Sequence, residues 1–393
     1  MRWKSLQLNG ASPDEPAAPV PPGISPAGAC DETWRATAVP AAARGAAPAL
    51  FERGAVTRSF DTPGFQGMTF YEVQARSIIN RVPEASKMAF RWTINPYRGC
   101  GHACVYCFAR NTHTYLDLDA GLDFNSKIVV KVNAPELVRK ELAARRWQGE
   151  HIAMGTNVDC YQRAEGRYRL MPGILTALRD AANPFSILTK GTLILRDLAL
   201  LEQSAEVTEV GLNVSVGSVD KALWRSIEPG TPSPDRRLGV CATLTEHGLR
   251  CGVLMGPVMP FLSDSPAQLE ATVREIAAAG ASQVSPIVLH LRPGAREWFY
   301  GWLGEHHPDL VARYRGLYRS GAYVPRGYQH RITEQVTELA RKHGVGRASP
   351  GQARAIGRRR PPAPRTATSQ ARRPADDGND PARPPGDVQL TLL

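Results

Sequence analysis

Short apolar runs alternate six times with amphipathic segments between residues 90 and 295. Read as strands, the apolar runs are 91–96, 151–156, 185–190, 209–217, 249–258 and 283–291. Read as helices, the segments with apolar residues at i, i+3, i+4 and i+7 are 134–146, 171–182, 193–203, 235–248 and 266–280. Six strand–helix repeats predict an α/β fold with a parallel sheet. They are too few for an eight-stranded barrel and enough for a partial one, and the pattern alone leaves a doubly wound open sheet as the alternative.

One further apolar run, 127–132, is either an extra strand or part of the first connection. The chain ends differ in composition from this middle part. Half of the 32 prolines lie in 1–50 and 347–393, where bulky apolar side chains are too few to offset chain entropy. We therefore expect a disordered Ala/Pro-rich head over 1–55, a folded core with flanking helices over 56–340, and a disordered basic Pro/Arg-rich tail over 341–393.

Net charge and apolar runs restrict the class of protein further. From residue 347 onward nine Arg face four Asp, so this part supplies +5 of the net charge of +11, and the middle keeps a modest excess that permits a nucleic-acid partner without requiring one. No run of eighteen apolar residues exists, and the first residues lack the apolar stretch of a secretory signal. We expect a cytoplasmic protein without a membrane partner.

Three of the seven cysteines fall within eight residues, in the stretch NPYRGCGHACVYCFAR. Cys100, Cys104 and Cys107 have the spacing C-x3-C-x2-C directly after the first predicted strand. Three thiolates on a short loop can hold three irons of a [4Fe–4S] cluster and leave the fourth iron open to an external chelating ligand. The alternative is a structural zinc site of three Cys and one His, with His102 inside the motif.

This motif resembles that of the radical SAM superfamily. The resemblance implies a partial (β/α)6 barrel whose open iron is chelated by S-adenosylmethionine. It implies reductive cleavage of that cofactor to methionine and a 5′-deoxyadenosyl radical, with electrons from a donor such as flavodoxin or ferredoxin. In the family, the aromatic residue before the last cysteine, here Tyr106, contacts the adenine.

A narrower resemblance covers residues 55–320. The stretches that carry it are MGTNVDCYQRAEGRYRLMPGIL, LTKGTLILRDLALL, SIEPGTPSPDRRL and the region around the cysteine motif. They are similar to the actinobacterial branch of spore-photoproduct-lyase-like proteins, which carry the label "DNA repair photolyase". The resemblance implies a lyase-type enzyme acting on nucleic acid such as a DNA lesion. Because one fold hosts many reactions, a peptide or small-metabolite substrate and a non-enzymatic metal-organised adaptor stay open.

The ends of the predicted strands supply candidate contacts to the cofactor, because barrel active sites lie at the carboxyl ends of strands. In GLNVSVG, Asn213 and Ser215 share one face with glycines, and the resemblance implies that they contact the ribose or carboxylate. Thr156, Asn157 and Asp159 end the second strand, where the family's contacts to the amino group lie, although the usual Gly-Gly-Glu is absent.

Lys190 ends the third strand and either pairs with the cofactor carboxylate or is an ordinary solvated lysine. Arg225 and Glu228 match the family pattern and alternatively form a structural ion pair. Cys160 is a candidate hydrogen-atom donor, because spore photoproduct lyase uses a thiol from a nearby position; the alternative is a small buried side chain.

Two features of the last residues suggest partners. Between Arg347 and Arg373 there are eight basic residues and no acidic one, which can follow a phosphate backbone or only increase solubility. The final QLTLL, Gln389 to Leu393, resembles the QLxLF peptide that docks on the bacterial sliding clamp, with Leu in place of Phe.

Overall fold

The computed structural model describes residues 54–83, 88 and 90–346. Nearly all of the expected head, most of the expected tail and the Gln389–Leu393 peptide lie outside these residues, so the expectations made for them stay predictions. The last helix, α12 (Arg326–His343), runs three residues past the expected core boundary at 340 and ends on Gly344, whose φ of 72° is that of a left-handed helix cap.

The main sheet contains all six predicted strands. They are β4 (Trp92–Ile94), β7 (Ile152–Met154), β8 (Phe185–Thr189), β9 (Val210–Ser215), β10 (Cys251–Val258) and β11 (Val284–Val288). Each pairs in parallel with the next, and β3 (Ile79–Arg81) joins β4 antiparallel at one edge. The strand order follows the chain from β4 to β11 without the reversal that defines a doubly wound sheet. Within the described residues no pairing joins β11 to β3, so the sheet is the expected partial barrel.

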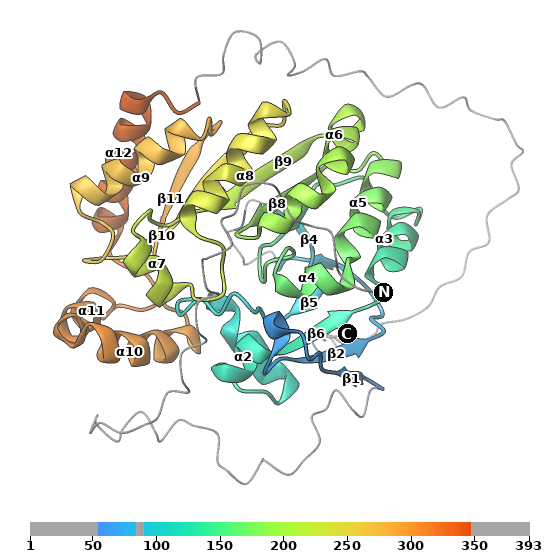
Figure 1. Ribbon diagram of the computed structural model, residues 1–393, viewed down its shortest axis with the longest axis horizontal. Coiled ribbons are helices and arrows are strands. Elements are labelled where there is room, and N and C mark those ends of the chain that lie inside the picture. Colours follow the sequence, from blue (N-terminus) through green and yellow to red (C-terminus); the bar gives the residue numbers. More distant parts are fainter. Residues whose placement is uncertain (1–53, 84–87, 89, 347–393) are drawn as a thin grey trace, which may run out of the picture. The chain divides into compact units, whose positions relative to one another are not determined.

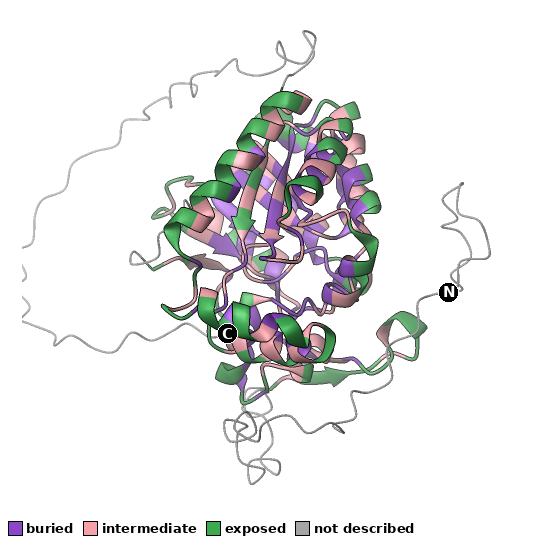
Figure 2. Cartoon of the chain, turned by 90° about the vertical axis from the view of Figure 1, so that its left-hand side faces the viewer, coloured by how far each residue is buried: buried purple, intermediate pink, exposed green. Residues whose placement is uncertain are grey.

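Helices cover one face of this sheet (Figure 1). The connecting helices are α3 (Ala134–Leu142), α5 (Leu170–Asp180), α6 (Leu198–Val207), α8 (Pro234–Glu246) and α9 (Pro266–Ala278). Leu212 and Val214 of β9 lie in the same buried cluster as Leu238 and Leu244 of α8. Because side chains alternate along a strand, Asn213 and Ser215 point to the opposite, inner face of the sheet. Figure 2 shows the exposed residues on the outer surfaces of the helices.

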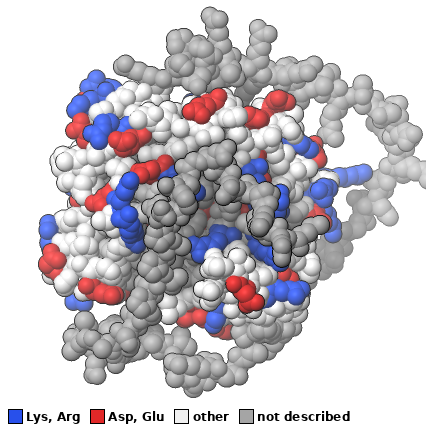
Figure 3. Space-filling model, in the orientation of Figure 1, with Lys and Arg blue, Asp and Glu red and all other residues white. Residues whose placement is uncertain are grey.

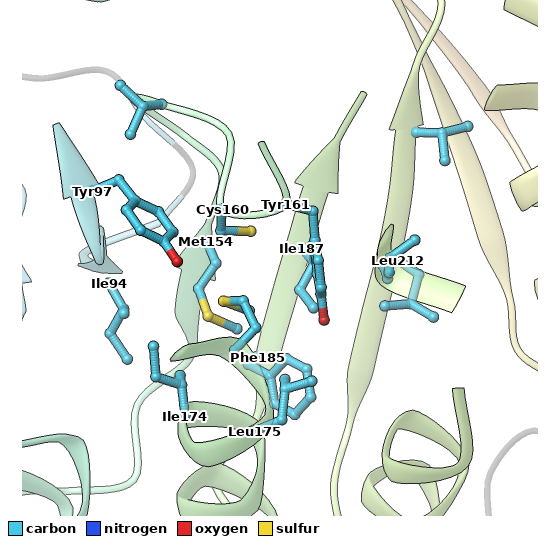
Figure 4. Packing of buried hydrophobic residues seen from close by; sticks show 14 of the residues in the cluster. Ile94, Tyr97, Met154, Cys160, Tyr161, Ile174, Leu175, Phe185, Ile187 and Leu212 are labelled. Atoms are coloured by element: carbon cyan, nitrogen blue, oxygen red, sulfur yellow. The ribbon is translucent and has the colours of Figure 1, made fainter. Parts of the chain in front are cut away.

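Two apolar clusters meet near the cysteine motif. The larger one fills the space between the sheet and α3, α5 and α8, and Figure 4 shows its centre, where Ile94, Met154 and Ile187 face Ile174 and Leu175 of α5. The second cluster joins Leu223 and Ile227 of α7 (Lys221–Ile227) to aromatic side chains of α10 (Ala295–His306) and α11 (Val311–Leu317). Cys100 belongs to the first cluster and Cys104 to the second, so the motif lies at their junction.

The apolar run 127–132 forms a strand of a separate, smaller sheet. This sheet has the order β1 (Val56–Arg58), β2 (Thr69–Val73), β6 (Lys127–Lys131) and β5 (Tyr97–Arg98). The chain passes from one sheet to the other directly after the predicted strand 91–96. That strand forms β4 of the main sheet, and β5, which follows it, pairs with β6 of the smaller sheet. Helices α2 (Leu122–Ser126) and α4 (Arg163–Tyr168) complete the described core. No helix among the described residues is long and apolar enough to cross a bilayer.

Lys and Arg side chains are spread over the face seen in Figure 3, with Asp and Glu side chains between them. The modest positive excess of the core is thus mixed with acidic side chains on this face.

Candidate active site

The three cysteines lie on a tightly bent loop between β5 and the 3₁₀ helix η4 (Phe108–Leu116). Gly99 opens the loop with a φ of 77°, and a Cβ there would lie 2.9 Å from both the His113 ring and the Lys127 carbonyl oxygen. Only glycine fits such a position. Ala103 also has a positive φ, 53°, within the motif. These bends turn the chain back on itself, so that residues 100 to 107 enclose a short loop.

Cys100 and Cys104 are buried, Cys107 is partly exposed, and the three thiols are close enough to influence one another. Burial raises the pKa of Cys100, and the nearby Asp159, Cys104 and Cys107 raise it further. Burial also raises the pKa of Cys104, to about 12. Metal ligation requires thiolates, so binding of a positive centre replaces the protons that burial otherwise keeps on these sulfurs.

The loop offers three cysteine thiols, which is the donor set of a [4Fe–4S] cluster with one open iron, each cysteine binding a different iron. In 54–83, 88 and 90–346 no three Cys, His, Asp or Glu side chains are arranged as ligands of a single metal ion. His102, the fourth ligand of the zinc alternative, instead faces Asp159, with 3.4 Å between its Nδ1 and the carboxylate Oδ2.

Two long polar side chains hold the backbone of this loop. The Gln162 amide donates to the Gly99 carbonyl at 2.9 Å and accepts from the Gly101 N–H at 3.0 Å. The fully buried Arg110 donates to the Cys104 carbonyl at 3.0 Å and lies 4.6 Å from the Trp298 ring. Neither residue was predicted from the sequence.

Asp159 links the cysteine loop to the end of β8. Its Oδ1 accepts hydrogen bonds from the Tyr161 N–H at 2.8 Å and the Thr189 hydroxyl at 2.7 Å. Its Oδ2 accepts from the Lys190 N–H at 2.6 Å and faces His102. Both oxygens are thus engaged with the protein, and a contact to a cofactor amino group would compete with these hydrogen bonds.

The structure brings Tyr106, Lys190 and Ser215 together. The Lys190 ammonium donates to the Ser215 hydroxyl at 2.8 Å and lies 5.8 Å from the Tyr106 ring centre. Ser215 in turn donates to the Gly256 carbonyl at 3.0 Å. Asn213 lies two residues before Ser215 in β9, on the same face. Gly252, its partner in β10, leaves room for the Asn213 side chain, since a Cβ there would lie 2.5 Å from Oδ1. The Lys190 ammonium after β8, the Ser215 hydroxyl and Asn213 amide of β9, and the Tyr106 ring of the cysteine loop therefore form one candidate binding group.

A buried ion pair between Glu228 and Arg237 contacts the Tyr106–Lys190–Ser215 group through Tyr106. Glu228 and Arg237 are 3% and 1% exposed, and Glu228 binds both Arg237 and the Tyr106 hydroxyl. Burial alone would raise the pKa of Glu228, but Arg237 and Lys190 hold it below its ordinary value. Arg225 stacks on Trp224 instead, so the alternative of an Arg225–Glu228 ion pair is not what the structure shows. The sequence signal for Arg237 was its place in the apolar helical stripe with Cys241 and Leu244.

The remaining candidates at the end of β7 lie in different surroundings. Thr156 is partly exposed, and Asn157 lines a hollow of about 290 Å³. Cys160 is 1% exposed within the larger apolar cluster near Met154 and Tyr161 (Figure 4). Burial, with Asp159 and Glu165, raises the pKa of the Cys160 thiol. These surroundings favour the buried structural interpretation of Cys160 over hydrogen-atom donation.

Residues 94–276 match the family model of the radical SAM superfamily. The chain belongs to this superfamily, whose members use a [4Fe–4S] cluster and S-adenosylmethionine, and it is an enzyme of that class. An uncharacterised protein of Mycobacterium tuberculosis is 48% identical over 299 residues, 76% of this chain and 88% of the relative. An uncharacterised protein of Methanocaldococcus jannaschii is 32% identical over 195 residues, 49% of this chain and 69% of the relative.

The fold is similar to that of a solved spore photoproduct lyase complexed with dinucleoside spore photoproduct. The TM-score is 0.52 at 16% sequence identity, over 70% of this chain and 80% of that chain. At this identity the similarity concerns the fold. The predictions of a radical SAM enzyme and of a partial barrel with a parallel sheet are confirmed.

Proposed function

We propose that Cys100, Cys104 and Cys107 hold one [4Fe–4S] cluster and that the adjoining strand ends bind S-adenosylmethionine. The observation that carries this proposal is the single buried loop of three mutually interacting thiols beside the Tyr106–Lys190–Ser215 group. When bound, the cluster supplies the electron that cleaves the cofactor to methionine and a 5′-deoxyadenosyl radical.

The residues of this chain bind and orient the cofactor in this proposal. Lys190 offers an ammonium to its carboxylate, and the Tyr106 ring offers an apolar face to its adenine. The hydrogen bond from Tyr106 to Glu228 fixes the plane of that ring. Asn213 and Ser215 on β9 offer hydrogen bonds to the ribose or carboxylate, and Thr156 and Asn157 lie where contacts to the amino group are expected.

For the substrate we propose nucleic acid, specifically a damaged nucleotide. Support comes from the positive net charge and from the fold shared with spore photoproduct lyase, whose structure holds a dinucleoside photoproduct. A cytoplasmic location with a flavodoxin or ferredoxin as electron donor fits this chemistry. Docking of Gln389–Leu393 on a sliding clamp rests on the peptide sequence alone and lies outside the described residues.

Anaerobic reconstitution tests the cofactor part of this proposal. We expect about four irons per chain and 5′-deoxyadenosine that forms only with a reductant. The Cys104→Ala variant should lose both, because one iron loses its ligand. Cys241→Ala is the matched control, since it removes a buried thiol from α8, outside the loop, and should keep both. Full activity of Cys104→Ala would contradict the proposal.

Salt-dependent binding of DNA or RNA tests the substrate class. Phosphate contacts release counterions, so the affinity should fall as salt rises. If the reconstituted enzyme cleaves S-adenosylmethionine but binds no nucleic acid at low salt, a peptide or small metabolite replaces nucleic acid as the proposed substrate.

A further inference from the structure

Three aromatic rings form a continuous row that begins at Phe108, the residue after the cysteine motif. His290 stacks on Tyr323 with 5.5 Å between ring centres and 27° between planes, and it lies 5.7 Å from Phe108. Arg292 joins the two ends of the row: its guanidinium lies 5.7 Å from the Phe108 ring centre and donates to the Tyr323 hydroxyl at 3.1 Å. We call these four residues the aromatic platform.

The platform is partly open to solvent, although two of its members are large aromatic side chains. Phe108 is 36% and Tyr323 52% exposed, and Arg292 is exposed as well. An aromatic row without an apolar cover is uncommon on a protein surface and marks a binding site more often than an isolated exposed ring does. Phe108 and Tyr323 belong to none of the buried apolar clusters of the described residues.

A hollow of about 290 Å³ lies beside the platform. Its lining residues are Phe108, Asn111, Thr112, Tyr115, Asn157, Arg292 and Pro293. The lining combines aromatic faces, amide and hydroxyl groups and one cation, and it contains no carboxylate. Ligand pockets in proteins measure about 300–1,000 Å³, so the hollow is at the small end of this range and suits one flat, polar-edged group.

Two residues that line the hollow are next to, or among, the residues proposed to bind the cluster and the cofactor. Phe108 follows the cluster ligand Cys107, and Asn157 belongs to the candidates for cofactor binding. A group held in the hollow therefore lies next to the place where the radical would form.

The platform is held in place by its surroundings. The loop that carries Tyr323 accepts a backbone hydrogen bond from Leu291 at Ala322, at 2.8 Å, and the Tyr318 hydroxyl donates to the Leu289 carbonyl at 2.6 Å. These bonds fix the segment 289–292 against the loop before any ligand arrives, so little conformational entropy would be lost on binding.

We propose that the aromatic platform and its hollow bind an unpaired nucleobase, with Arg292 beside the adjoining phosphate. This inference rests on the proposed nucleic-acid substrate and names where that substrate is held. Bases stack on aromatic and guanidinium faces, and the amide and hydroxyl groups of the hollow can pair with a base edge. Burial together with Arg292 lowers the pKa of His290, which keeps its ring neutral and suited to stacking. A paired base within a duplex cannot present its face to such a row.

Equilibrium binding of a short labelled single-stranded oligodeoxynucleotide to the reconstituted full-length enzyme tests this inference. Tyr323→Ala should weaken binding about tenfold, the size of one base–aromatic stack. Tyr323→Phe keeps the ring and should restore affinity to within about twofold. Val207→Ala shortens an exposed apolar side chain of α6, away from the platform, and should leave binding unchanged. Thermal denaturation of each variant reports its folding.

Three results would overturn the platform: equal affinity of Tyr323→Ala and wild type, equal affinity of wild type for single strand and duplex, or no oligonucleotide binding at all. The nine Arg from residue 347 onward can attract phosphates through charge alone, so the comparison is repeated at higher salt, where the Tyr323 effect should persist. Reductive cleavage of S-adenosylmethionine by the wild type alone is measured in parallel. If cleavage occurs but Tyr323 has no effect, only the platform fails; if cleavage fails while the Tyr323 effect remains, only the cofactor assignment fails.

Discussion

Glu228 and Arg237 show how much of this site depends on single side chains. Both are almost fully buried, and they connect the cysteine loop to β9, because Glu228 binds the Tyr106 hydroxyl and Arg237 donates to the Ser215 carbonyl at 2.7 Å. Each charge is tolerated in the interior only because the other is present. Loss of either one leaves the partner unpaired where water cannot reach it.

The Glu228→Gln variant should therefore have a lower free energy of unfolding, by about 3–5 kcal/mol, since the Arg237 charge stays buried without a counterion. Urea denaturation measures this change. Glu338→Gln, which breaks the exposed pair with Arg341, is the control and should have no measurable effect. Similar losses in the two variants would show that burial of the Glu228 pair is unimportant.

Cys100, Cys104 and Cys107 could be singled out from the sequence as candidate cluster ligands, because that pattern depends on local spacing, and their role as ligands stays a prediction. Gln162 and Arg110 could not be found in the same way, since they act on carbonyl groups whose position depends on tertiary packing. Arg237 is intermediate: its helical phase indicated burial, but the partner Glu228 was visible only in the structure.

At the scale of elements, β6 contains a charge where a strand of its type carries apolar residues. Lys131 is 5% exposed at the end of β6. Burial lowers its pKa to about 8, and the nearby Arg98 adds to the effect. The ordinary value is about 10.4, so the unfolded chain binds a proton more tightly than the folded chain. Folding is consequently penalised below pH ~8, and the penalty disappears as the pH rises toward ~10.

We expect Lys131→Met to raise the free energy of unfolding at pH 7, by an amount on the order of 3 kcal/mol, because the buried charge is removed. The difference from wild type should shrink as the pH increases from about 8 to 10. Urea denaturation over this range measures it, with Lys140→Met on the exposed side of α3 as the control. A difference that stays constant with pH would contradict the assignment to Lys131.

The strands and long helices were predictable, because apolar runs and helical stripes follow from burial. Membership of a sheet was not. The run 91–96 gives β4, yet the residues immediately after it form β5 of the other sheet, and the run 127–132 became its neighbour β6. Pairing depends on contacts between distant segments, which local periodicity does not encode. Short elements such as α4 and α7 lack the length for a clear periodic signal.

At the scale of the whole chain, the excess of positive charge is divided between the core and the residues after 346. The basic residues from Arg347 onward can contribute to nucleic-acid affinity only through phosphates, a contribution that salt weakens. The platform contribution comes mainly from stacking and is less sensitive to salt.

Deletion of 347–393 should therefore reduce the slope of log affinity against log salt by about 0.7 for every phosphate that these residues neutralise in the full-length chain. Fluorescence anisotropy with a single-stranded oligonucleotide over a range of salt concentrations gives this slope. Deletion of Gln389–Leu393 alone removes no basic residue and serves as the control. If the two deletions give the same slope, these cations take no part in binding.

Asp159 has a thermodynamic consequence for the enzyme. Its carboxylate faces His102 in the cysteine loop and accepts hydrogen bonds from the Thr189 hydroxyl and the Lys190 N–H. The Lys190 ammonium in turn donates to the Ser215 hydroxyl. Because Asp159 binds the Lys190 backbone N–H, we expect the order of the cysteine loop and the position of the Lys190 side chain to be coupled. Coupling between two sites is reciprocal. If ordering of the loop increases the affinity of a ligand at Lys190 by some factor, binding of that ligand increases the equilibrium constant for loop ordering by the same factor. Cluster retention and cofactor affinity should accordingly rise and fall together when the connection through Asp159 is altered.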